Sequence, residues 1–455
     1  MKIPLTPPNI RDLLSNMSAQ ELLQVMSLQP GPLVNGRYLH WDELRHRPVP
    51  EGLSHEQLWA AVRMARQSQL KPLPLLLDKH GRPMRFAMPE PILRLLNYID
   101  KNAAGQISLP DQLVSAHDRD QYIVHSLIEE AITSSQLEGA STTRLVAEAM
   151  LREGRKPQDR SERMIFNNFR AMQWIRAHKA EPLSPELVLE LHRLVTENTL
   201  EEADEAGCLR RRDDVRVVDQ RSSIVLHEPP AAATLPERLE RLCAFANGSE
   251  DDEPFAPPVL RAILLHFMIG YDHPFVDGNG RTARALFYWS MARQGYGLME
   301  YISISQIIKR APARYARAFL HVETDDNDTT YFLLHQLEIV REAIGALHEH
   351  LKHKSAEQRA TERLLRTSST LRGRFNHRQL ALLTHALKHP GETYLIEGHQ
   401  RSHDIAYATA RADLLDLAAA GLLERGKRGR AMLFIVPNDL RQRIQGAEKV
   451  DVPPE

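Results

Sequence analysis

Cysteine is scarce in this chain, whose 455 residues contain two, Cys208 and Cys243. They lack the spacing of a metal knuckle and are too few for a disulfide scaffold, so we expect reduced structural thiols. Long apolar runs are missing as well. No window approaches the roughly 20 apolar residues that span a bilayer, and the start, MKIPLTPPNIRDLL, lacks the apolar core of a signal peptide. The sequence predicts a cytoplasmic protein without a membrane partner.

An excess of charge of one sign is also absent. The 58 lysines and arginines nearly balance the 59 aspartates and glutamates, for a net charge of −1. No overall field therefore favours nucleic acid, which only a local basic patch could bind. Hydrophobic residues make up 42% and charged residues 26%, which is typical of globular chains and argues against disorder. The length indicates several domains.

Helical periodicity dominates most of the sequence and predicts a mainly α fold. Residues 1–115 indicate a helical N-terminal region interrupted by prolines. Residues 116–350 indicate one large helical domain. Within it, the stretch GCLRRRDDVRVVDQRSSIVLHEPP predicts a small β-hairpin with a polar turn.

The composition changes beyond residue 350. Residues 351–370 are highly charged and predict a linker helix, and residues 371–445 predict a winged helix-turn-helix domain. Its recognition helix, SHDIAYATARADLLDL, would expose His403, Tyr407 and Arg411. In the wing that follows, Glu424 is outnumbered by basic residues, which favours contact with DNA phosphates. These basic residues are Arg425, Lys427, Arg428 and Arg430.

The most informative stretch is HPFVDGNGRTAR, residues 273–284, which lies at the junction of two apolar helical segments. The glycines around Asn279 permit backbone angles closed to other residues. Successive N–H groups can therefore form an anion-binding concavity at the start of the second helix. Arg281 and Arg284 lie three residues apart on its first turn, and their guanidinium groups suit phosphate oxygens. The expected guest is a polyphosphate.

Two more residues of this stretch add chemistry. A carboxylate beside phosphates needs a bridging hard cation, so Asp277 predicts Mg²⁺ and, with the polyphosphate, a nucleotide. His273 ends the first helical segment, and its ordinary pKa of about 6.5 suits a general base near neutral pH. A hydroxyl docked beside it could attack a phosphorus atom while the arginines and the metal stabilise the leaving group.

The stretch resembles the signature of Fic-domain proteins: His, Pro in many members, Phe, any residue, Asp or Glu, Gly, Asn, Gly, Arg, two variable residues and Arg. Every fixed position is present. The resemblance implies an all-helical Fic core that transfers AMP from ATP to a Ser, Thr or Tyr hydroxyl of a target protein (AMPylation) and releases pyrophosphate. It implies His273 as the base and Asp277 as the Mg²⁺ ligand. The residues it places at the ATP phosphates are Gly278, Asn279, Gly280, Arg281 and Arg284.

Downstream, SISQIIKRAPARY resembles the family segment that helps to form the nucleotide pocket. Where many members carry two tyrosines, this chain has Tyr315 followed by Ala316. The resemblance therefore assigns no residue to the adenine.

A second motif, SSQLEG at residues 134–139, resembles the inhibitory pattern of the family: Ser or Thr, three residues, Glu, then Gly or Asn. Ser134 and Glu138 share one helix face. In the family the glutamate pairs with the second signature arginine, here Arg284, and prevents the productive pose of ATP. Because the motif precedes the signature, it implies the class with an N-terminal inhibitory helix.

The degree of inhibition determines how strong the contact between Glu138 and Arg284 must be. Hundredfold suppression requires about 2.7 kcal/mol, whereas an exposed ion pair supplies roughly 0.2–1 kcal/mol. We therefore expect a largely buried, bidentate contact between Glu138 and Arg284.

The hairpin near residues 215–225 lies where the family has its flap. The edge of the flap can capture an extended target segment. The other interpretation is a hairpin that only covers the core.

Two other functions also stay open. The same site could remove AMP from a modified protein, with Glu138 aligning a water molecule. Alternatively, the Fic core could sense a nucleotide for a transcriptional regulator that binds DNA. Fic cores often self-associate, so a homodimer is a further expectation.

Overall fold

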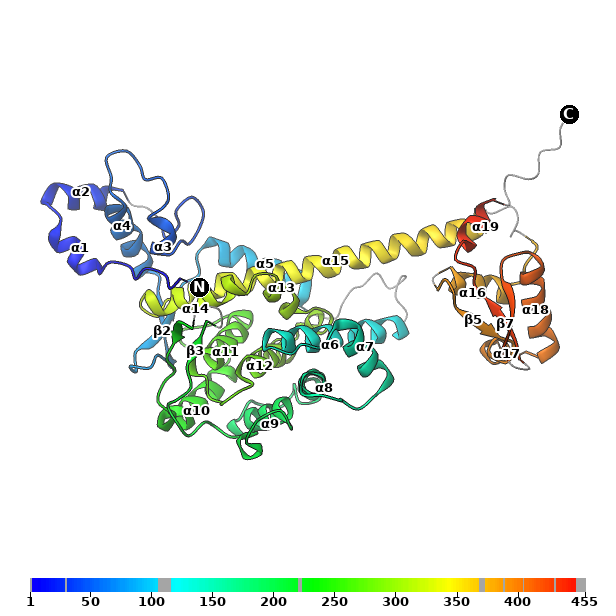
Figure 1. The fold of residues 1–455 in the computed structure, drawn as a ribbon. Coiled ribbons are helices and arrows are strands. Elements are labelled where there is room, and N and C mark those ends of the chain that lie inside the picture. Colours follow the sequence, from blue (N-terminus) through cyan, green and yellow to red (C-terminus); the bar gives the residue numbers. More distant parts are fainter. Residues whose placement is uncertain are drawn as a thin grey trace. The chain divides into compact units, whose positions relative to one another are not determined.

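The computed structural model describes residues 2–28, 31–104, 116–219, 223–367, 373–387, 389–403, 405–428 and 431–446. They form two compact units, within residues 1–347 and within residues 348–455. Helices predominate in the first unit, and the strands of the described residues belong to short antiparallel sheets (Figure 1). The mainly α prediction is confirmed.

The described residues up to 104 contain five helices: α1 (Ile10–Asn16), α2 (Ala19–Ser27), α3 (Trp41–Leu44), α4 (His55–Gln67) and α5 (Glu90–Ala103). Ser18 and Ser54 begin α2 and α4 with capping boxes, which satisfy backbone N–H groups that the helix leaves unpaired. Leu44 and Trp59 are buried in a small core between α3 and α4. Local capping and a shared apolar core thus account for these short helices.

A β-hairpin in this region corrects the sequence-based expectation of helices alone. It consists of β1 (Lys71–Leu77) and β2 (Pro83–Phe86). Pro72 and Pro74 suggested a break between helices. In a two-stranded sheet, however, one edge of each strand has no partner strand, and proline is tolerated there because its missing N–H costs no ladder bond. Leu73 and Phe86 are buried, so the hairpin belongs to the main core.

The remainder of the first unit is helical. Its helices are α6 (Ala116–Leu137), α7 (Arg144–Glu153), α8 (Arg160–Ala177), α9 (Pro185–Thr196), α10 (Leu235–Ala246), α11 (Pro258–Asp272), α12 (Asn279–Arg293), α13 (Ile304–Arg310), α14 (Pro312–Thr324) and the first part of α15 (Thr330–Thr367), which from His348 onward belongs to the second unit. Short 3-10 turns η1 (Ala203–Glu205), η2 (Ala232–Thr234) and η3 (Gly297–Tyr301) lie between them. The charged segment predicted as a linker helix, residues 351–370, lies in α15 as far as Thr367, and residues 368–370 are outside the described residues.

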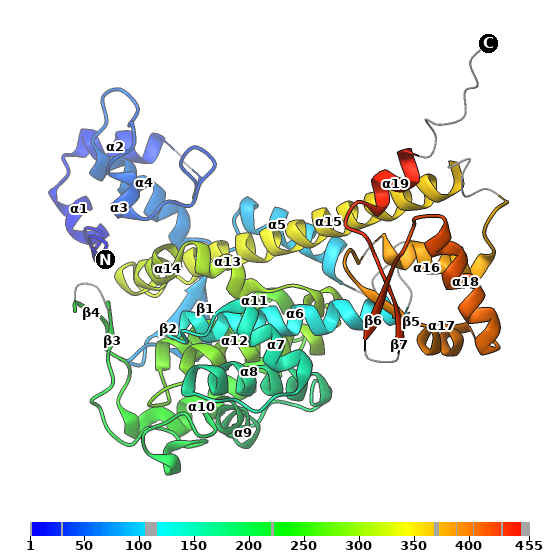
Figure 2. The ribbon, with the colours of Figure 1, turned by 45° about the vertical axis from the view of Figure 1, so that its right-hand side comes forward.

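Helices α11 and α12 lie at the centre of this unit. All side chains of residues 259–269 in α11 and 285–291 in α12 are buried. A helix that is buried on every side needs neighbours on every side, and α6, α8, α9 and α10 supply them (Figure 2). The loop between α11 and α12 is therefore held between packed helices.

The predicted hairpin before α11 is confirmed. It consists of β3 (Val217–Val218) and β4 (Val225–His227), which pair antiparallel. Residues 220–222 of its turn lie outside the described residues. Val218 and Val225 are exposed, so the hairpin presents apolar side chains to solvent.

The second unit has its own core, in which Leu383, Leu414 and Phe434 are buried. Its elements are α16 (His377–Ala386), β5 (Thr393–Leu395), α17 (Ile396–His403), α18 (Tyr407–Ala419), β6 (Glu424–Arg428), β7 (Ala431–Ile435) and α19 (Leu440–Gly446). The strands form an antiparallel sheet in the order β5, β7, β6. The assignment to the winged helix-turn-helix class stays a prediction.

One detail of that prediction is wrong. The segment expected as a single recognition helix is divided, because α17 ends at His403 and α18 begins at Tyr407. Arg430 and the side chain of Arg428, two of the predicted wing cations, lie outside the described residues.

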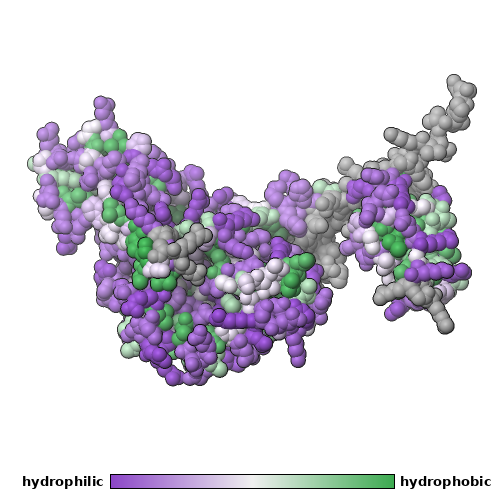
Figure 3. Space-filling view, in the orientation of Figure 1, coloured by the Kyte–Doolittle hydropathy of each residue, from purple (hydrophilic) through white to green (hydrophobic). Residues whose placement is uncertain are grey.

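The visible surface is largely hydrophilic, with small scattered hydrophobic areas (Figure 3). Among the described residues, no helix combines the length and the apolar character needed to cross a bilayer. Cys208 and Cys243 are both free thiols, and Cys243 is buried.

Candidate functional site

The loop from α11 to α12 turns on two residues with left-handed backbone conformations. His273 caps α11 at φ 44° and ψ 57°, and Gly278 caps the start of α12 at φ 84°. Between them, the Asn279 side chain accepts a hydrogen bond from the Phe275 N–H (3.0 Å) and donates one to the Phe275 carbonyl (2.8 Å). Asn279 is 3% exposed. Its side-chain amide thus fixes the conformation of the loop. Its backbone N–H lies at the start of α12.

His273 is held as a neutral base. Its Nδ1 lies 3.1 Å from the Gly270 carbonyl oxygen, which can only accept, so Nδ1 carries the proton and Nε2 keeps its lone pair. Burial lowers the pKa of His273, which the bond to Gly270 and the charge of Glu138 partly oppose. An imidazole that is neutral near pH 7 and has Nε2 as the acceptor suits proton abstraction.

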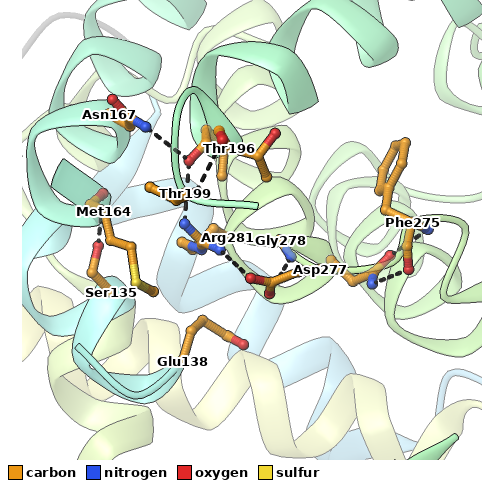
Figure 4. Close-up of polar contacts among 12 residues, drawn as sticks. Ser135, Glu138, Met164, Asn167, Thr196, Thr199, Phe275, Asp277, Gly278 and Arg281 are labelled. Atoms are coloured by element: carbon orange, nitrogen blue, oxygen red, sulfur yellow. Dashed lines mark hydrogen bonds and ion pairs between the residues drawn. The ribbon is translucent and has the colours of Figure 1, made fainter. Parts of the chain in front are cut away.

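Asp277 lies between the loop backbone and two arginines. Its Oδ1 accepts a hydrogen bond from the Gly278 N–H at 2.6 Å, and its Oδ2 lies 3.4 Å from Arg281 Nη2 and 3.5 Å from Arg160 Nη2. Figure 4 shows Asp277 between Arg281 and Gly278 at the start of α12. The Asp277 side chain is 37% exposed, so a hard cation could reach its oxygens.

Arg281 has unused hydrogen-bonding capacity. Its side chain is fully buried, and its Nη1 donates to the Val195 carbonyl at 3.2 Å. Within the described part of the chain, its Nε has no hydrogen-bond acceptor, and its Nη2 has only the ion pair with Asp277 Oδ2 at 3.4 Å. Unsatisfied buried donors are rare because each costs about 1–3 kcal/mol. Their presence at a helix N-terminus indicates a seat for an anion.

Arg284 joins α12 to the end of α6. Its Nε donates to Ser134 Oγ at 2.8 Å and its Nη2 to the Ser134 carbonyl at 3.0 Å. Nη2 also donates to Glu138 Oε1 at 2.8 Å. The Arg284 side chain is 3% exposed and that of Glu138 26%. Although burial opposes the charged form, the charge of Glu138 raises the pKa of Arg284.

The contact between Glu138 and Arg284 differs in one respect from the prediction. The structure has one hydrogen bond between these side chains, so the bidentate prediction is wrong. Ser134, one helical turn earlier, accepts from Nε and shares Nη2 with the glutamate, so the Nε–Nη2 edge of the guanidinium is not available for a bidentate pair. A single charge-assisted bond of this kind still contributes about 1.5–3 kcal/mol.

The Glu138 carboxylate also lies against the backbone of Gly280. A side-chain carbon added at Gly280 would overlap Glu138 Oε1. The first-turn N–H groups of a helix have no partner within the helix, and the helix dipole favours negative charge there. Glu138 therefore supplies an anion at the start of α12, beside both signature arginines.

Two positioning residues were missed from the sequence. His192 of α9 is fully buried, stacks on Phe275 and bridges the Gly207 N–H to the Asp277 carbonyl, with distances of 3.0 and 2.9 Å. Arg210 donates to the His273 carbonyl at 2.9 Å and to the Pro230 carbonyl. His192 could have been noticed as a polar residue on the apolar face of its helix. Nothing distinguishes Arg210 from its neighbours in the run RRR.

The structure therefore brings the predicted residues of both motifs to one place. Ser134 and Glu138 contact Arg284, and Glu138 lies against Gly280. Asp277 and Arg281 lie at the same helix start, as Figure 4 shows. A neutral imidazole beside an anion seat at a helix N-terminus defines a helical domain suited to phosphate chemistry.

Comparison with known proteins is consistent with this class. Residues 182–291 match the model of the Fic/DOC family, and this part of the chain is a Fic domain. Among curated relatives, protein adenylyltransferase Fic of Drosophila virilis is 31% identical and that of Drosophila grimshawi 29% identical over 178 residues. Each match covers 39% of this chain and 33% of the relative. The chain thus spans about a third of the length of the curated relatives that it matches.

A solved structure shares the fold. It is the crystal structure of a Fic family protein from Desulfovibrio desulfuricans G20, with a TM-score of 0.51 and 17% sequence identity. The match covers 76% of this chain and 96% of that protein. At this identity the likeness concerns the fold.

Proposed function

We propose that the chain is a protein adenylyltransferase that transfers AMP from ATP to a Ser, Thr or Tyr hydroxyl of a target protein, and that Glu138 holds it inhibited. The observation that carries the proposal is the Glu138 carboxylate at the start of α12, hydrogen-bonded to Arg284 and lying against Gly280. A protein carboxylate in that seat indicates that the seat accepts anions. The Fic domain and the curated relatives named protein adenylyltransferase Fic support the same activity.

The phosphates of ATP would take the place of the Glu138 carboxylate. The backbone N–H groups of residues 278–280 would face them, as at other helix N-termini that bind phosphate. Arg281 Nε has no acceptor, Arg281 Nη2 has only its ion pair with Asp277, and Arg284 would exchange Glu138 for a phosphate oxygen. Inhibition follows from competition between two anions for one set of donors.

The transfer step would use His273 as the base. The hydroxyl oxygen of the target attacks the α-phosphorus of ATP while its proton passes to His273 Nε2. The bond from the α-phosphorus to the bridging oxygen of the β-phosphate breaks, and pyrophosphate leaves with the negative charge. The Nδ1 bond to Gly270 orients the ring and stabilises the imidazolium formed.

Mg²⁺ fits the residues around Asp277. One carboxylate together with substrate phosphates is a usual ligand set for this ion, and the Asp277 side chain is partly exposed. Bound there, the metal would neutralise charge on the leaving pyrophosphate. Asp277 would then exchange its arginine contacts for the cation.

The β3–β4 hairpin would hold the target segment by strand pairing. Its strands are short, and exposed Val218, Ile224 and Val225 offer apolar contacts. His227 fastens β4 to the core, with Nε2 2.6 Å from the Tyr271 carbonyl and Nδ1 2.7 Å from Glu323 Oε2. Backbone pairing selects little for sequence, so many hydroxyl-bearing segments would fit.

Incubation with ATP labelled at the α-phosphate tests the proposal. We expect weak labelling of proteins by the parent, stronger labelling by Glu138→Gly and none by His273→Ala combined with Glu138→Gly. Glu148→Gly, a change to a glutamate of α7, is the matched control and should behave as the parent. Labelling that persists without His273, or that Glu138→Gly leaves unchanged, contradicts the proposal.

The opposite reaction, removal of AMP, uses the same residues and needs its own experiment. Proteins labelled by Glu138→Gly are freed of nucleotide and then incubated with the parent chain. Stable label supports transfer as the function. Loss of label that requires Glu138 favours hydrolysis, with the carboxylate aligning water.

A DNA-binding role for the second unit is a second proposal. Tyr407 and Arg411 are exposed on α18, and Arg425 and Lys427 are exposed on β6. Retardation of duplex DNA by the full chain, and its loss in the double variant Arg425→Ala with Lys427→Ala, would support it. Binding that does not weaken with salt would contradict phosphate contact.

A further inference from the structure

Two histidines and a glutamate lie together in the second unit, far along the chain from the Fic signature. His385 is in the last turn of α16, and His389 and Glu392 follow in the turn that leads to β5. One nitrogen or oxygen atom from each residue lies within 4.8 Å of the other two, and all three residues are exposed. The two imidazole rings stack with centroids 4.3 Å apart.

The backbone that carries these side chains is held by hydrogen bonds. The His389 N–H donates to the Ala386 carbonyl at 3.1 Å, and the Glu392 N–H donates to the His389 carbonyl at 3.3 Å. The Val436 N–H, just after β7, donates to the Glu392 carbonyl at 2.8 Å. The backbone at His389 and Glu392 is thus held by hydrogen bonds, and rotation of the side chains could bring their ligand atoms onto one ion.

We propose that His385, His389 and Glu392 bind a divalent transition-metal ion, with Zn²⁺ as the best chemical fit. Imidazole nitrogens and a carboxylate are common zinc ligands, and three protein ligands leave one position for water. Tetrahedral ligands about 2.0–2.2 Å from zinc lie about 3.3–3.6 Å apart. Ligand atoms that lie up to 4.8 Å apart must therefore approach one another by up to about 1.2–1.5 Å, which the half-exposed side chains of His389 and Glu392 permit.

A neighbouring tyrosine supports this assignment. His385 Nδ1 lies 2.7 Å from the Tyr394 hydroxyl. Imidazoles that bind metals usually donate their other ring N–H to an oxygen, which fixes the orientation of the ring. If Nδ1 donates to Tyr394, ligation falls to Nε2. A pair of surface histidines alone would be a weak indication; the carboxylate and the tyrosine contact make it a metal site.

Calorimetric titration with Zn²⁺ alone tests this proposal. The full chain is prepared without a histidine tag and freed of metal with a chelator. We expect the parent to bind one equivalent, and His389→Ala to lower the affinity at least about tenfold. Tyr394→Phe should weaken binding less. His377→Ala, at the exposed start of the same helix, should bind as the parent does.

Two results would overturn the proposal: no zinc uptake by the parent with excess metal, or an unchanged affinity in His389→Ala. Thermal unfolding supplies a second measurement. Zinc should raise the melting temperature of the parent and of His377→Ala but not that of His389→Ala, because a ligand of the folded state stabilises it. These outcomes do not depend on ATP, so they stand apart from the proposed AMP transfer.

Discussion

The Glu138 carboxylate lies against the α-carbon of Gly280, so that a methyl group at Gly280 would overlap Glu138 Oε1. The glutamate follows α6, and the glycine lies in the first turn of α12. Glycine at this position leaves room for an anion to approach the helix backbone. The glycine that would allow phosphate to approach thus also allows the Glu138 carboxylate to lie there.

Gly280→Ala tests whether carboxylate and phosphate share this space. In a Glu138→Gly background, we expect Gly280→Ala to weaken ATP binding, measured by calorimetry, by about 5- to 150-fold, the equivalent of 1–3 kcal/mol of overpacking. Gly345→Ala in the same background is the control, because an added carbon there meets no atom within 4 Å. Equal ATP affinity with alanine at position 280 would place the phosphates elsewhere.

The pH dependence of transfer tests His273 as the base. The imidazole must be neutral to accept a proton, so the rate should rise with pH through its pKa. Since burial lowers the pKa of His273, the midpoint should lie below the ordinary value of about 6.5. The charge of Glu138 raises the pKa of His273, so Glu138→Gln should move the midpoint to lower pH.

The measurement is kcat/KM for ATP in the parent and in Glu138→Gln between about pH 5 and 8. Titration of His192 does not contribute to this pH range, because burial lowers the pKa of His192 to about 4. A midpoint above the ordinary histidine value, or one that Glu138→Gln raises, would remove His273 from the role of base.

Much of the candidate site is local in sequence, which is why it was predictable. His273, Asp277 and Arg281 lie within nine residues, and a helix start fixes their relation to one another. Glu138 and Arg284 are 146 residues apart, and their pairing followed from the family resemblance rather than from spacing. Arg284 donates hydrogen bonds to both Ser134 and Glu138 because of the way α6 packs on α12, and no local sequence pattern reveals that packing.

The errors in the predicted fold also have physical reasons. The β1–β2 hairpin was missed because Pro72 and Pro74 usually interrupt strands, and only its two-stranded pairing makes them acceptable. α13 and α14 were not foreseen as separate helices. Pro312 divides them by occupying the first turn of α14, where its missing N–H has no helical partner in any case.

Glu130 offers a test of how α6 is held. Its carboxylate is buried and accepts hydrogen bonds from the Tyr288 hydroxyl at 3.0 Å and from the Ser303 hydroxyl at 2.7 Å. Glu130→Ala removes this acceptor, which also serves the Ser305 N–H at 3.1 Å, and each buried donor left without a partner costs about 1–3 kcal/mol. We expect a lower melting temperature and, because Glu138 lies at the end of the same helix, a higher rate of AMP transfer.

Glu148→Ala on α7 is the control for this change and should alter neither quantity. A lower melting temperature with unchanged transfer would show that Glu130 stabilises the domain without positioning Glu138.

Arg160 tests the proposed role of Asp277 in metal binding, because it would compete with Mg²⁺ for the same oxygen. Arg160 Nη2 lies 3.5 Å from Asp277 Oδ2, and the Arg160 side chain is 65% exposed. An exposed ion pair of this kind contributes roughly 0.2–1 kcal/mol. If Mg²⁺ must displace it, Arg160→Ala should lower the Mg²⁺ concentration for half-maximal transfer by up to about fivefold. Transfer would be measured at saturating ATP in the Glu138→Gly background.

Arg193→Ala is the control for this change. It removes a comparably exposed arginine that pairs with Glu190 and should leave the Mg²⁺ requirement unchanged. A higher Mg²⁺ requirement in Arg160→Ala would mean that Arg160 assists phosphate binding instead, since losing a phosphate contact weakens the ATP that brings the metal to Asp277.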